Sequence, residues 1–523
     1  MLVKAKTLKQ IKQKKLIDRL KIQIVNDFLV LEKPLNGKKL NYSLNLLAQA
    51  IQKTLNINSK FKLFISYQGM FLPKKIFQNV LDYFSFFCET TTYNSLLSIP
   101  LELDYYAQTK LGYDFLIKAI YHHKLKKLVI KLVNFNEEIP VEKLTEIVNI
   151  YQTLNEYSAL SNRAKSNSLN IAQLLHTLSD LKTGLTKDFV SLKERYKTQF
   201  FINSRSIVAR NLATELFTNY KNNYQLGATF FPTYISTWFW RWRLKTKKNK
   251  NLTAVYDLDF NDNLEAWFVL NQKLKKLNNL DLALFFLYFF LEEFKFKKTS
   301  LDDHFVVISH ESSYKIVELL KLYKVKYYFY NNQTINEYLQ DPNCLFVFTN
   351  KTFIITPTES LPFQNYYFLL YLTIMHNSYK NRNNLLTFKY RQVLELFGLT
   401  KSLRVHKKFK QEKLYFLLRA VRTIFNSFNS GTLFNNLIVH NKQEKDRIIL
   451  FQFTSEKHHT MTWSYDLVAE KIQINYDVCF QYNFKSNGSH LNFLKMWWLS
   501  RKIFKQTKKL YRSYQKTKKQ TKA

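Results

Sequence analysis

An alternation of apolar strands and amphipathic helices between residues 304 and 355 constrains the fold of this chain more than any other feature. Residues 304–308 form a strand of the buried type, in which four apolar residues follow His304, and residues 325–330 form the next strand. Between them, Ile316, Leu319 and Leu320 recur at helical spacing. A strand, a helix and a strand at this spacing predict a crossover within a parallel sheet. We therefore expect an α/β domain.

The same pattern begins earlier in the chain. Residues 199–202 form a short apolar strand, and a helix is predicted from Ile207 onward. Two further strands are predicted at residues 345–348 and 353–355. In the stretch 264–297, leucines recur at heptad-like spacing among lysines, which predicts a helical hairpin inserted into the sheet domain.

The ends of the chain follow other patterns. Residues 1–110 read as a basic, α-rich N-terminal extension that contains one strand near 62–66. After residue 380, two helices at 388–397 and 413–428 precede two short strands at 433–439 and 448–453. This order is typical of a winged helix, and it is equally compatible with a sheet edge in another α+β module.

The predicted fold class is accordingly α/β, with extensions at both ends. It comprises a flavodoxin-like parallel sheet domain, a helical insertion, an α-rich N-terminal extension and an α+β, winged-helix-like C-terminal extension. The predicted domains are residues 1–110, residues 111–379 with the insertion at about 264–297, residues 380–494, and a basic tail at residues 495–523.

A large positive charge limits the partners. The chain has 79 Lys and Arg against 39 Asp and Glu, a formal net charge of +40. A surface this basic favours a polyanionic partner, with nucleic acid first and an anionic membrane surface second. Because 46% of the residues are hydrophobic and 16% are aromatic, the chain can bury a core and is not a disordered tail.

The residue usage indicates the genome that encodes the chain. Lys, Asn, Phe and Tyr are abundant, whereas Gly and Pro each occur 8 times. The abundant residues have A/T-rich codons, so we expect an A/T-rich mitochondrial genome such as that of a ciliate, with the protein in the mitochondrial matrix. The first 25 residues are predicted to form a retained basic helix rather than a presequence, because they favour Lys over Arg and Ser.

Several kinds of site are missing from the sequence. No apolar run reaches the roughly 18 residues that a membrane span needs. The three cysteines lie far apart, and we find no phosphate-binding glycine loop, zinc spacing, metal site or catalytic constellation. The sequence therefore predicts a protein that is not an enzyme, with no cofactor and no small-molecule substrate.

Five pieces of the sequence, in order, resemble the bacterial-type small-subunit ribosomal protein two family. They are residues 200–209, 234–243, 302–332, 355–360 and 366–375, with the stretch 264–297 where that family inserts its helical hairpin. Pro357 and Ser360 are the clearest single matches. The resemblance implies a structural constituent of the mitochondrial ribosomal small subunit that binds ribosomal RNA and neighbouring ribosomal proteins.

Three basic clusters are predicted to contact RNA. Cations neutralise phosphates, and the aromatic side chains among them can stack on bases. The predicted RNA-binding residues are Arg241, Trp242, Arg243, Lys245, Lys247, Lys248, Lys250, Lys401, Arg404, Lys407, Lys408, Lys410, Arg501, Lys502, Lys505, Lys508, Lys509, Arg512, Lys516, Lys518 and Lys519.

Two other functions remain open at this stage. The winged-helix pattern near residues 388–453 is also similar to the DNA-binding unit of plasmid replication initiators. The aromatic content is compatible with a peripheral subunit of a mitochondrial membrane complex.

Overall fold

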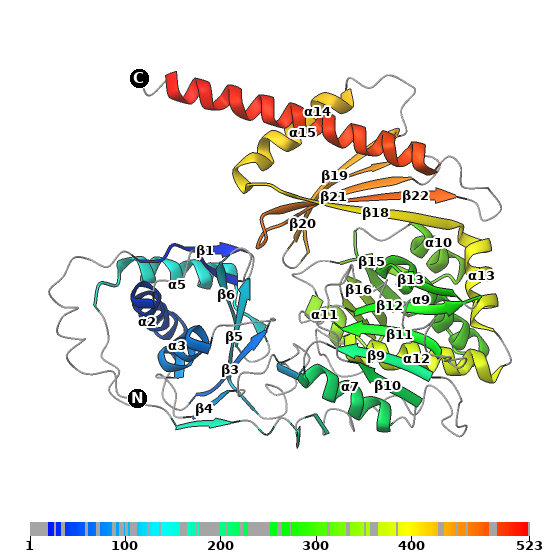
Figure 1. The fold of residues 1–523 in the computed structure, drawn as a ribbon, viewed down its shortest axis with the longest axis horizontal. Helices are drawn as coiled ribbons and strands as arrows, with labels where there is room; N and C mark the ends of the chain where they lie inside the picture. The colour runs from blue at the N-terminus through cyan, green and yellow to red at the C-terminus, as the bar shows by residue number, and fades with distance from the viewer. Residues whose placement is uncertain are drawn as a thin grey trace. The chain divides into compact units, whose positions relative to one another are not determined.

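The computed structural model divides into two compact units, each described here by itself (Figure 1). Unit 1 comprises Met1–Leu178, Arg205–Leu212 and Asp259–Asp262, and unit 2 comprises Ser179–Ser204, Ala213–Leu258 and Asn263–Ala523. The structure describes residues 19–520 apart from 26–27, 33–36, 58–60, 69–73, 86–89, 94–98, 100–102, 105–111, 123–125, 135–136, 157–164, 169, 171, 174, 177–198, 205–206, 220–222, 228–251, 259–263, 272, 311–313, 331–334, 350–351, 356–364, 383–384, 427–433, 445–446, 456–458 and 481–488. The predicted basic helix at the N-terminus lies almost entirely outside these residues.

Unit 1 is built on a mixed sheet. Its strand order is β1 (Ile22–Val25), β2 (Phe28–Glu32), β6 (Lys127–Asn134), β5 (Phe115–His122), β3 (Lys62–Gln68), β4 (Thr90–Tyr93) and β8 (Lys165–Ser168), with β7 (Glu137–Glu138) beside β6. Strand β3 runs parallel to β4 and β5, whereas β5 and β6 are antiparallel. The strand predicted near residues 62–66 is confirmed. The predicted α-rich extension is wrong, because residues 1–110 contribute four strands to this sheet in addition to two helices.

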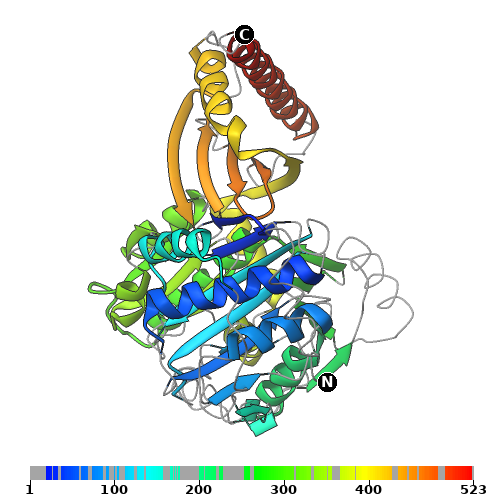
Figure 2. The same cartoon turned by 90° about the vertical axis from the view of Figure 1, so that its left-hand side faces the viewer.

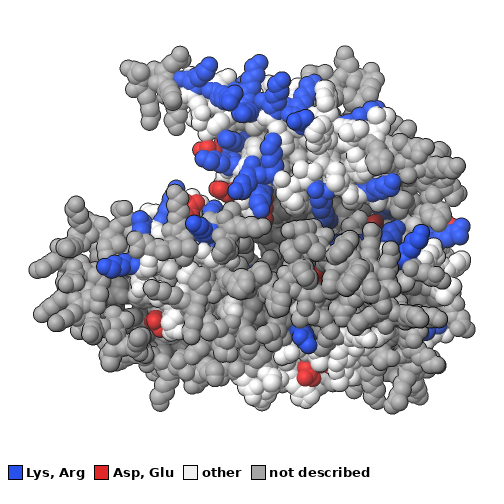
Figure 3. All heavy atoms as spheres, in the orientation of Figure 1, with Lys and Arg blue, Asp and Glu red and all other residues white. Residues whose placement is uncertain are grey.

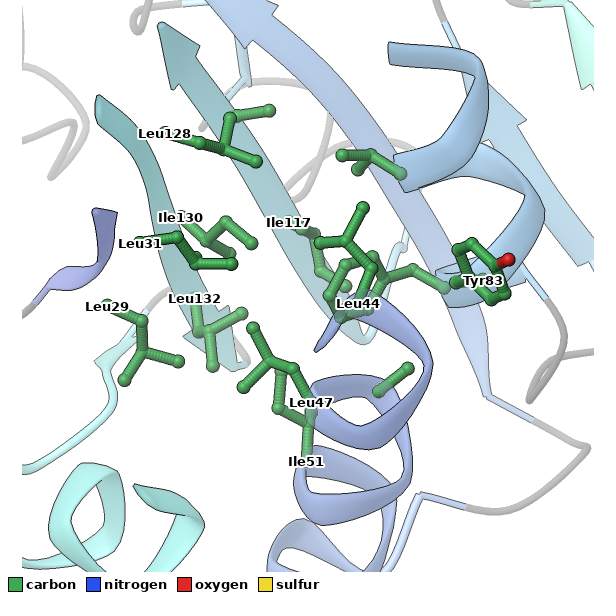
Figure 4. Close-up of a cluster of buried hydrophobic side chains, with 14 of the residues drawn as sticks. Leu29, Leu31, Leu44, Leu47, Ile51, Tyr83, Ile117, Leu128, Ile130 and Leu132 are labelled. Carbon is green, nitrogen blue, oxygen red and sulfur yellow. The ribbon is translucent and has the colours of Figure 1, made fainter. Parts of the chain in front are cut away.

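The core of unit 1 lies between one face of this sheet and three helices. These helices are α2 (Gly37–Leu55), α3 (Lys74–Phe84) and α5 (Val141–Thr153). On α2, Leu40, Leu44, Leu47 and Ile51 recur every three or four residues and are all buried, so one side of the helix is apolar. Figure 4 shows Leu44, Leu47 and Ile51 directed at Ile117, Ile130 and Leu132 of the sheet.

The first sheet of unit 2 combines a parallel half with an antiparallel half. Its order is β10 (Asn223–Gly227), β9 (Gln199–Ser204), β11 (Leu252–Leu258), β12 (Leu264–Leu270) and β13 (Lys273–Leu277). Strand β9 is parallel to both β10 and β11, and helix α7 (Ile207–Asn219) follows β9 in the chain. The predicted strand and helix after residue 199 are confirmed.

The predicted helical hairpin at residues 264–297 is wrong. Residues 264–277 form the antiparallel strands β12 and β13, and only α9 (Asn279–Phe296) is helical. Asn271 adopts a positive φ of 50° between the two strands, a conformation that Asn tolerates in tight turns. The spacing of four between Leu270 and Leu274 therefore spans a turn, so it does not mark a helix face.

The second sheet of unit 2 contains the crossover that the sequence predicts. Its order is β15 (Lys326–Phe329), β14 (Phe305–Ile308), β16 (Cys344–Thr349) and β17 (Thr352–Ile355). Strand β14 is parallel to β15 and β16, and α10 (Tyr314–Leu322) lies between β14 and β15 in the chain. Helix α11 (Ile335–Gln340) precedes β16, and α12 (Asn365–Asn381) is buried over most of its length.

The C-terminal part of unit 2 is a fully antiparallel sheet rather than a winged helix. Its order is β18 (Leu399–Lys408), β22 (Lys471–Phe480), β21 (Thr460–Asp466), β20 (Arg447–Thr454) and β19 (Asn436–Glu444). Helix α13 (Leu386–Phe397) precedes it, and η3 (Gln411–Lys413) and α14 (Leu414–Asn426) follow β18. The two helices and the hairpin were predicted at nearly the right positions, but β18, β21 and β22 were not predicted.

The basic C-terminal tail is helical. Helix α15 (Ser489–Gln520) packs Met496, Leu499 and Ile503 into the core that the sheet shares with α14. Figure 2 shows α14 and α15 on the same side of this sheet. The apolar residues of this tail recur at helical spacing, so one side of the helix can cover the sheet.

Together these observations correct the predicted fold class. The described residues form four separate sheets instead of one flavodoxin-like sheet with helical and winged-helix extensions. Each short βαβ pattern was read correctly, but strands from both ends of the chain build sheets of their own. No helix among the described residues is long and apolar enough to cross a membrane.

Candidate functional site

The strongest candidate site lies where the parallel strands β9 and β11 end. Asn203 of β9 and Asp257 of β11 are register partners, and both side chains are buried. The Asn203 Nδ2 donates a hydrogen bond of 2.8 Å to Oδ1 of Asp257. The carboxyl ends of parallel strands are where α/β sheets commonly bind ligands, so this buried carboxylate occupies a favourable position for binding.

The sequence that follows Asp257 is rich in oxygen ligands. Asp259, Asn261 and Asp262 come within the next five positions, although their structure lies outside the described residues. Carboxylate and amide oxygens are the donors that Mg²⁺ and Ca²⁺ prefer. Among the described residues alone there is no group of three His, Cys, Asp or Glu side chains that could hold a metal ion. Asp257 is therefore the described residue that could supply an oxygen ligand to a divalent cation at this edge.

The strands beneath Asp257 are apolar and pack against a buried histidine of α12. Phe200 of β9 stacks on Tyr256 of β11 with 6.1 Å between ring centroids, and His376 of α12 meets Phe200 edge-on at 5.7 Å. Burial raises the pKa of Tyr256 well above its usual value and lowers the pKa of His376 to about 3. Both side chains are therefore neutral at pH 7, whereas Asp257 has an ionisable carboxyl group at this end of β11.

A second polar edge belongs to the sheet of β14. Ser309 follows β14 and is fully buried, and the next residue, His310, stacks on Phe329 of β15. The ring centroids of His310 and Phe329 are 4.8 Å apart, and the planes differ by 10°. His440 of β19 lies 5.6 Å from His310, so the β14 sheet and the C-terminal sheet each contribute a histidine to this cluster.

Unit 1 contains a buried ion pair. Lys118 of β5 contacts the carboxylate of Asp104, and both side chains have no exposed surface. The Lys118 Nζ also donates to the carbonyl oxygen of Ile99 at 3.0 Å. Burial raises the pKa of Asp104, and the positive charge of Lys118 opposes that rise. Because the Lys118 ammonium contacts both a carboxylate and a backbone carbonyl, we interpret the pair as structural.

The predicted RNA-binding residues occupy two neighbouring elements of unit 2, as far as they are described. Lys401, Arg404, Lys407 and Lys408 belong to strand β18, which is an edge of its sheet. The predicted residues from Arg501 to Lys519 all belong to α15. Figure 3 shows Lys and Arg side chains in a row along this helix. Lys410 lies just before η3, and the predicted residues between Arg241 and Lys250 lie outside the described residues.

The two elements are in contact. The Lys407 Nζ lies 3.7 Å from the centroid of the Phe504 ring on α15. Burial lowers the pKa of Lys407, and the nearby positive charges of Arg501 and Lys508 lower it further. The structure therefore brings the second and third predicted clusters together, into one positively charged region.

Comparison with known proteins finds a likeness in structure alone. No family model and no curated protein matches the sequence. Parafusin from Paramecium, described as an exocytosis-sensitive phosphoprotein and a phosphoglucomutase, has a TM-score of 0.60 at 14% identity, over 95% of this chain and 98% of its own. A protein from Thermus thermophilus described as a phosphomannomutase has a TM-score of 0.62 at 12% identity, over 94% and 99%.

A third structure supports the same fold. A phosphoglucomutase/phosphomannomutase family protein from Burkholderia thailandensis has a TM-score of 0.60 at 10% identity, and the match covers 93% of this chain and 98% of that protein. These likenesses extend over nearly the whole of each chain. At such low identity they show that the chain has the fold of these proteins.

This finding overturns the resemblance to the ribosomal protein family. The matched pieces that the structure describes are short strands and helices, which occur in the same order in many α/β proteins. The predicted ribosomal function, the ribosomal RNA and protein partners, and both alternative functions lose their support with it. The same finding contradicts the predictions of no enzymatic activity and no small-molecule substrate, because the structures that share this fold are described as phosphoglucomutase and phosphomannomutase proteins.

Asn203 and Asp257 are not among the site residues predicted from the sequence. Neither residue belongs to a motif that the sequence alone identifies as a catalytic or metal site. The available signal was an apolar strand, residues 252–256, followed directly by four oxygen-bearing side chains within six residues. That segment is conspicuous in a chain with a net charge of +40.

Proposed function

We propose that this chain is a sugar-phosphate mutase that binds a hexose phosphate and moves its phosphoryl group between two hydroxyls of the sugar. The observation that carries the proposal is the buried Asp257 at the carboxyl edge of β11, held by Asn203 and followed by a segment rich in oxygen ligands. The fold that the chain shares with phosphoglucomutase and phosphomannomutase enzymes supports the same class of substrate.

The charges of the chain suit such a substrate. A hexose phosphate is a dianion near neutral pH, and phosphoryl transfer depends mainly on positioning and on neutralising the charge of the transferred group. Asp257 would supply an oxygen ligand to a divalent cation, which neutralises phosphate charge when it is bound. Asn203 would fix the orientation of the Asp257 carboxylate through the hydrogen bond of 2.8 Å.

The proposal is tested with the full chain and two sugar phosphates. Glucose 1-phosphate and mannose 1-phosphate are each incubated with the protein and MgCl₂, and formation of the 6-phosphate is followed by ³¹P NMR. We expect turnover that a chelator abolishes. We expect Asp257→Asn to lower turnover at least about 100-fold, because a metal ligand loses its charge.

A matched variant distinguishes the loss of the Asp257 carboxylate from the change in net charge. Asp303→Asn makes the same chemical change at an exposed position that contributes to neither strand edge, and it should retain full turnover. Absence of conversion by the folded wild-type chain at millimolar substrate would sink the proposal. Equal turnover of wild type and Asp257→Asn would remove the role given to this carboxylate.

A further inference from the structure

Helix α15 covers the C-terminal sheet with only one of its faces. Met496, Leu499 and Ile503 are buried in the core, and Thr507 is buried one turn later. Successive buried positions lie three or four residues apart, so they follow one stripe along the helix. The opposite face of a helix of 32 residues, about 48 Å long, points away from that core.

The first turns of the outward face are apolar and exposed. Leu491, Leu494 and Trp498 have 57%, 59% and 58% of their surface exposed. Their spacing of three and four residues places them on a single stripe. Trp497 beside them is 42% exposed. Exposed large apolar side chains that share one helix face mark a contact surface rather than the scattered exposure found on most proteins.

The same outward face becomes cationic toward the C-terminus. It carries Arg501, Lys505, Lys508, Lys509, Arg512 and Lys516, all of them exposed. The helix contains no Asp or Glu. Among the groups that pack against it, Glu412 of η3 accepts a hydrogen bond of 2.7 Å from the Tyr511 hydroxyl, while Lys407 adds a further positive charge.

Two tryptophans contact two cations where the apolar half of the outward face meets its cationic half. The guanidinium of Arg501 lies 4.4 Å from the Trp497 ring centroid, and Lys502 Nζ lies 5.4 Å from the Trp498 ring centroid. A basic helix with Leu and Trp on its accessible face is typical of proteins that lie in the interface of a lipid bilayer. Tryptophan and the long cationic side chains are both suited to the headgroup level.

We propose that the outward face of α15 binds the surface of an anionic lipid bilayer. Leu491, Leu494 and Trp498 would enter the boundary between headgroups and acyl chains, and the cations beyond Arg501 would contact lipid phosphates. The exposed leucines favour a bilayer over nucleic acid, because base stacking uses aromatic rings and has no role for leucine. The apolar and cationic halves of the outward face also lie along one line, so both halves can contact a flat surface at the same time.

The proposal is tested by co-sedimentation of the full chain with vesicles. One set of vesicles is phosphatidylcholine alone, and the other contains 30% phosphatidylglycerol. We expect binding to the anionic vesicles, weakened when salt is raised from 0.1 to 0.5 M, and little binding to the neutral ones. Reversal of three charges, Lys505→Glu, Lys509→Glu and Arg512→Glu, should weaken binding at least about 100-fold.

Two further variants make the outcome specific. Leu494→Gln with Trp498→Gln should weaken binding on the order of 10-fold while leaving all charges in place. A control with Lys298→Glu, Lys321→Glu and Lys326→Glu changes the net charge equally at exposed positions outside α15, and it should bind as the wild type does. Circular dichroism checks that each variant retains its helix content.

Three results would overturn the proposal. The first is equal binding to neutral and anionic vesicles, and the second is an equal loss of binding in the control variant. The third is displacement of the protein from vesicles by a short RNA, with RNA binding unaffected by Leu494→Gln and Trp498→Gln. This last result would assign the helix to nucleic acid.

Discussion

The imidazole of His376 lies edge-on to the phenyl ring of Phe268, with 4.6 Å between the ring centroids and 81° between the ring planes. His376 is 2% exposed, and neither of its ring nitrogens has a hydrogen-bond partner. The aromatic rings on both sides of the imidazole supply packing but leave its polar atoms unsatisfied. This position is therefore one where the folded state favours the uncharged side chain strongly.

Replacing His376 is expected to flatten the dependence of stability on pH. Its pKa is lowered to about 3 by burial, whereas the unfolded chain binds the proton near pH 6.5. Protonation therefore stabilises the unfolded state relative to the folded state, and the free energy of unfolding decreases as the pH falls from about 6.5 toward about 3. Between pH 7 and pH 5 this loss amounts to about 2 kcal/mol, and it should be absent in His376→Leu.

Urea unfolding at the two pH values measures this difference. His376→Leu should also be more stable than the wild type at pH 7 by about 1 kcal/mol, because two unsatisfied buried nitrogens are removed. An unchanged pH dependence in His376→Leu would contradict the expectation. The same flattening in His176→Leu, whose side chain is exposed, would assign the effect elsewhere.

The buried pair of Asp104 and Lys118 gives a second prediction. Lys118→Met should destabilise unit 1 by about 3–5 kcal/mol, because the Asp104 carboxylate then remains buried without its charge partner. Asp104→Asn combined with Lys118→Met removes both charges and should recover much of this loss. The free energies of unfolding are compared by urea titration. A double variant as unstable as Lys118→Met would show that the stranded charge is not the cause.

Two arginine–glutamate pairs give a third prediction that depends on burial alone. Arg382 Nη2 lies 2.8 Å from Oε2 of Glu293, whose side chain is 3% exposed, and Arg391 Nε lies 2.9 Å from Oε1 of Glu395, which is 51% exposed. Arg382→Ala leaves a buried carboxylate and should cost about 2–4 kcal/mol. Arg391→Ala breaks an exposed pair and should cost at most about 0.5 kcal/mol.

Thermal unfolding of the two variants measures this contrast. Each variant loses one arginine and one ion pair, so net charge cannot explain a difference between them. Arg382 also lies 4.5 Å from the Phe296 ring, so Arg382→Lys, which retains a cation, should recover part of the loss. Similar shifts for Arg382→Ala and Arg391→Ala would show that burial of the glutamate does not set the cost.

Local patterns predicted many elements of this fold correctly. The apolar run at residues 304–308 and the helix after it were found because a buried strand and an amphipathic helix have distinct periods. The spacing of Leu270 and Leu274 led to the wrong prediction of a helical hairpin, because a spacing of four is also produced by two strands joined at Asn271. Asp257 was missed because its partner, Asn203, lies 54 residues away in the chain and only strand pairing brings the two together.

The sequence by itself determined the charge of the protein, its capacity to bury a core and the position of the parallel crossover. Its A/T-rich residue usage also predicts a mitochondrial location, which stays a prediction. The tertiary structure alone decided how many sheets the strands form, because strands that are distant in the sequence pair with one another and local periodicity does not show which strands pair. It also decided that the basic tail is an ordered helix. Met496, Leu499 and Ile503 pack against a sheet, and three strands of that sheet were not predicted from the sequence.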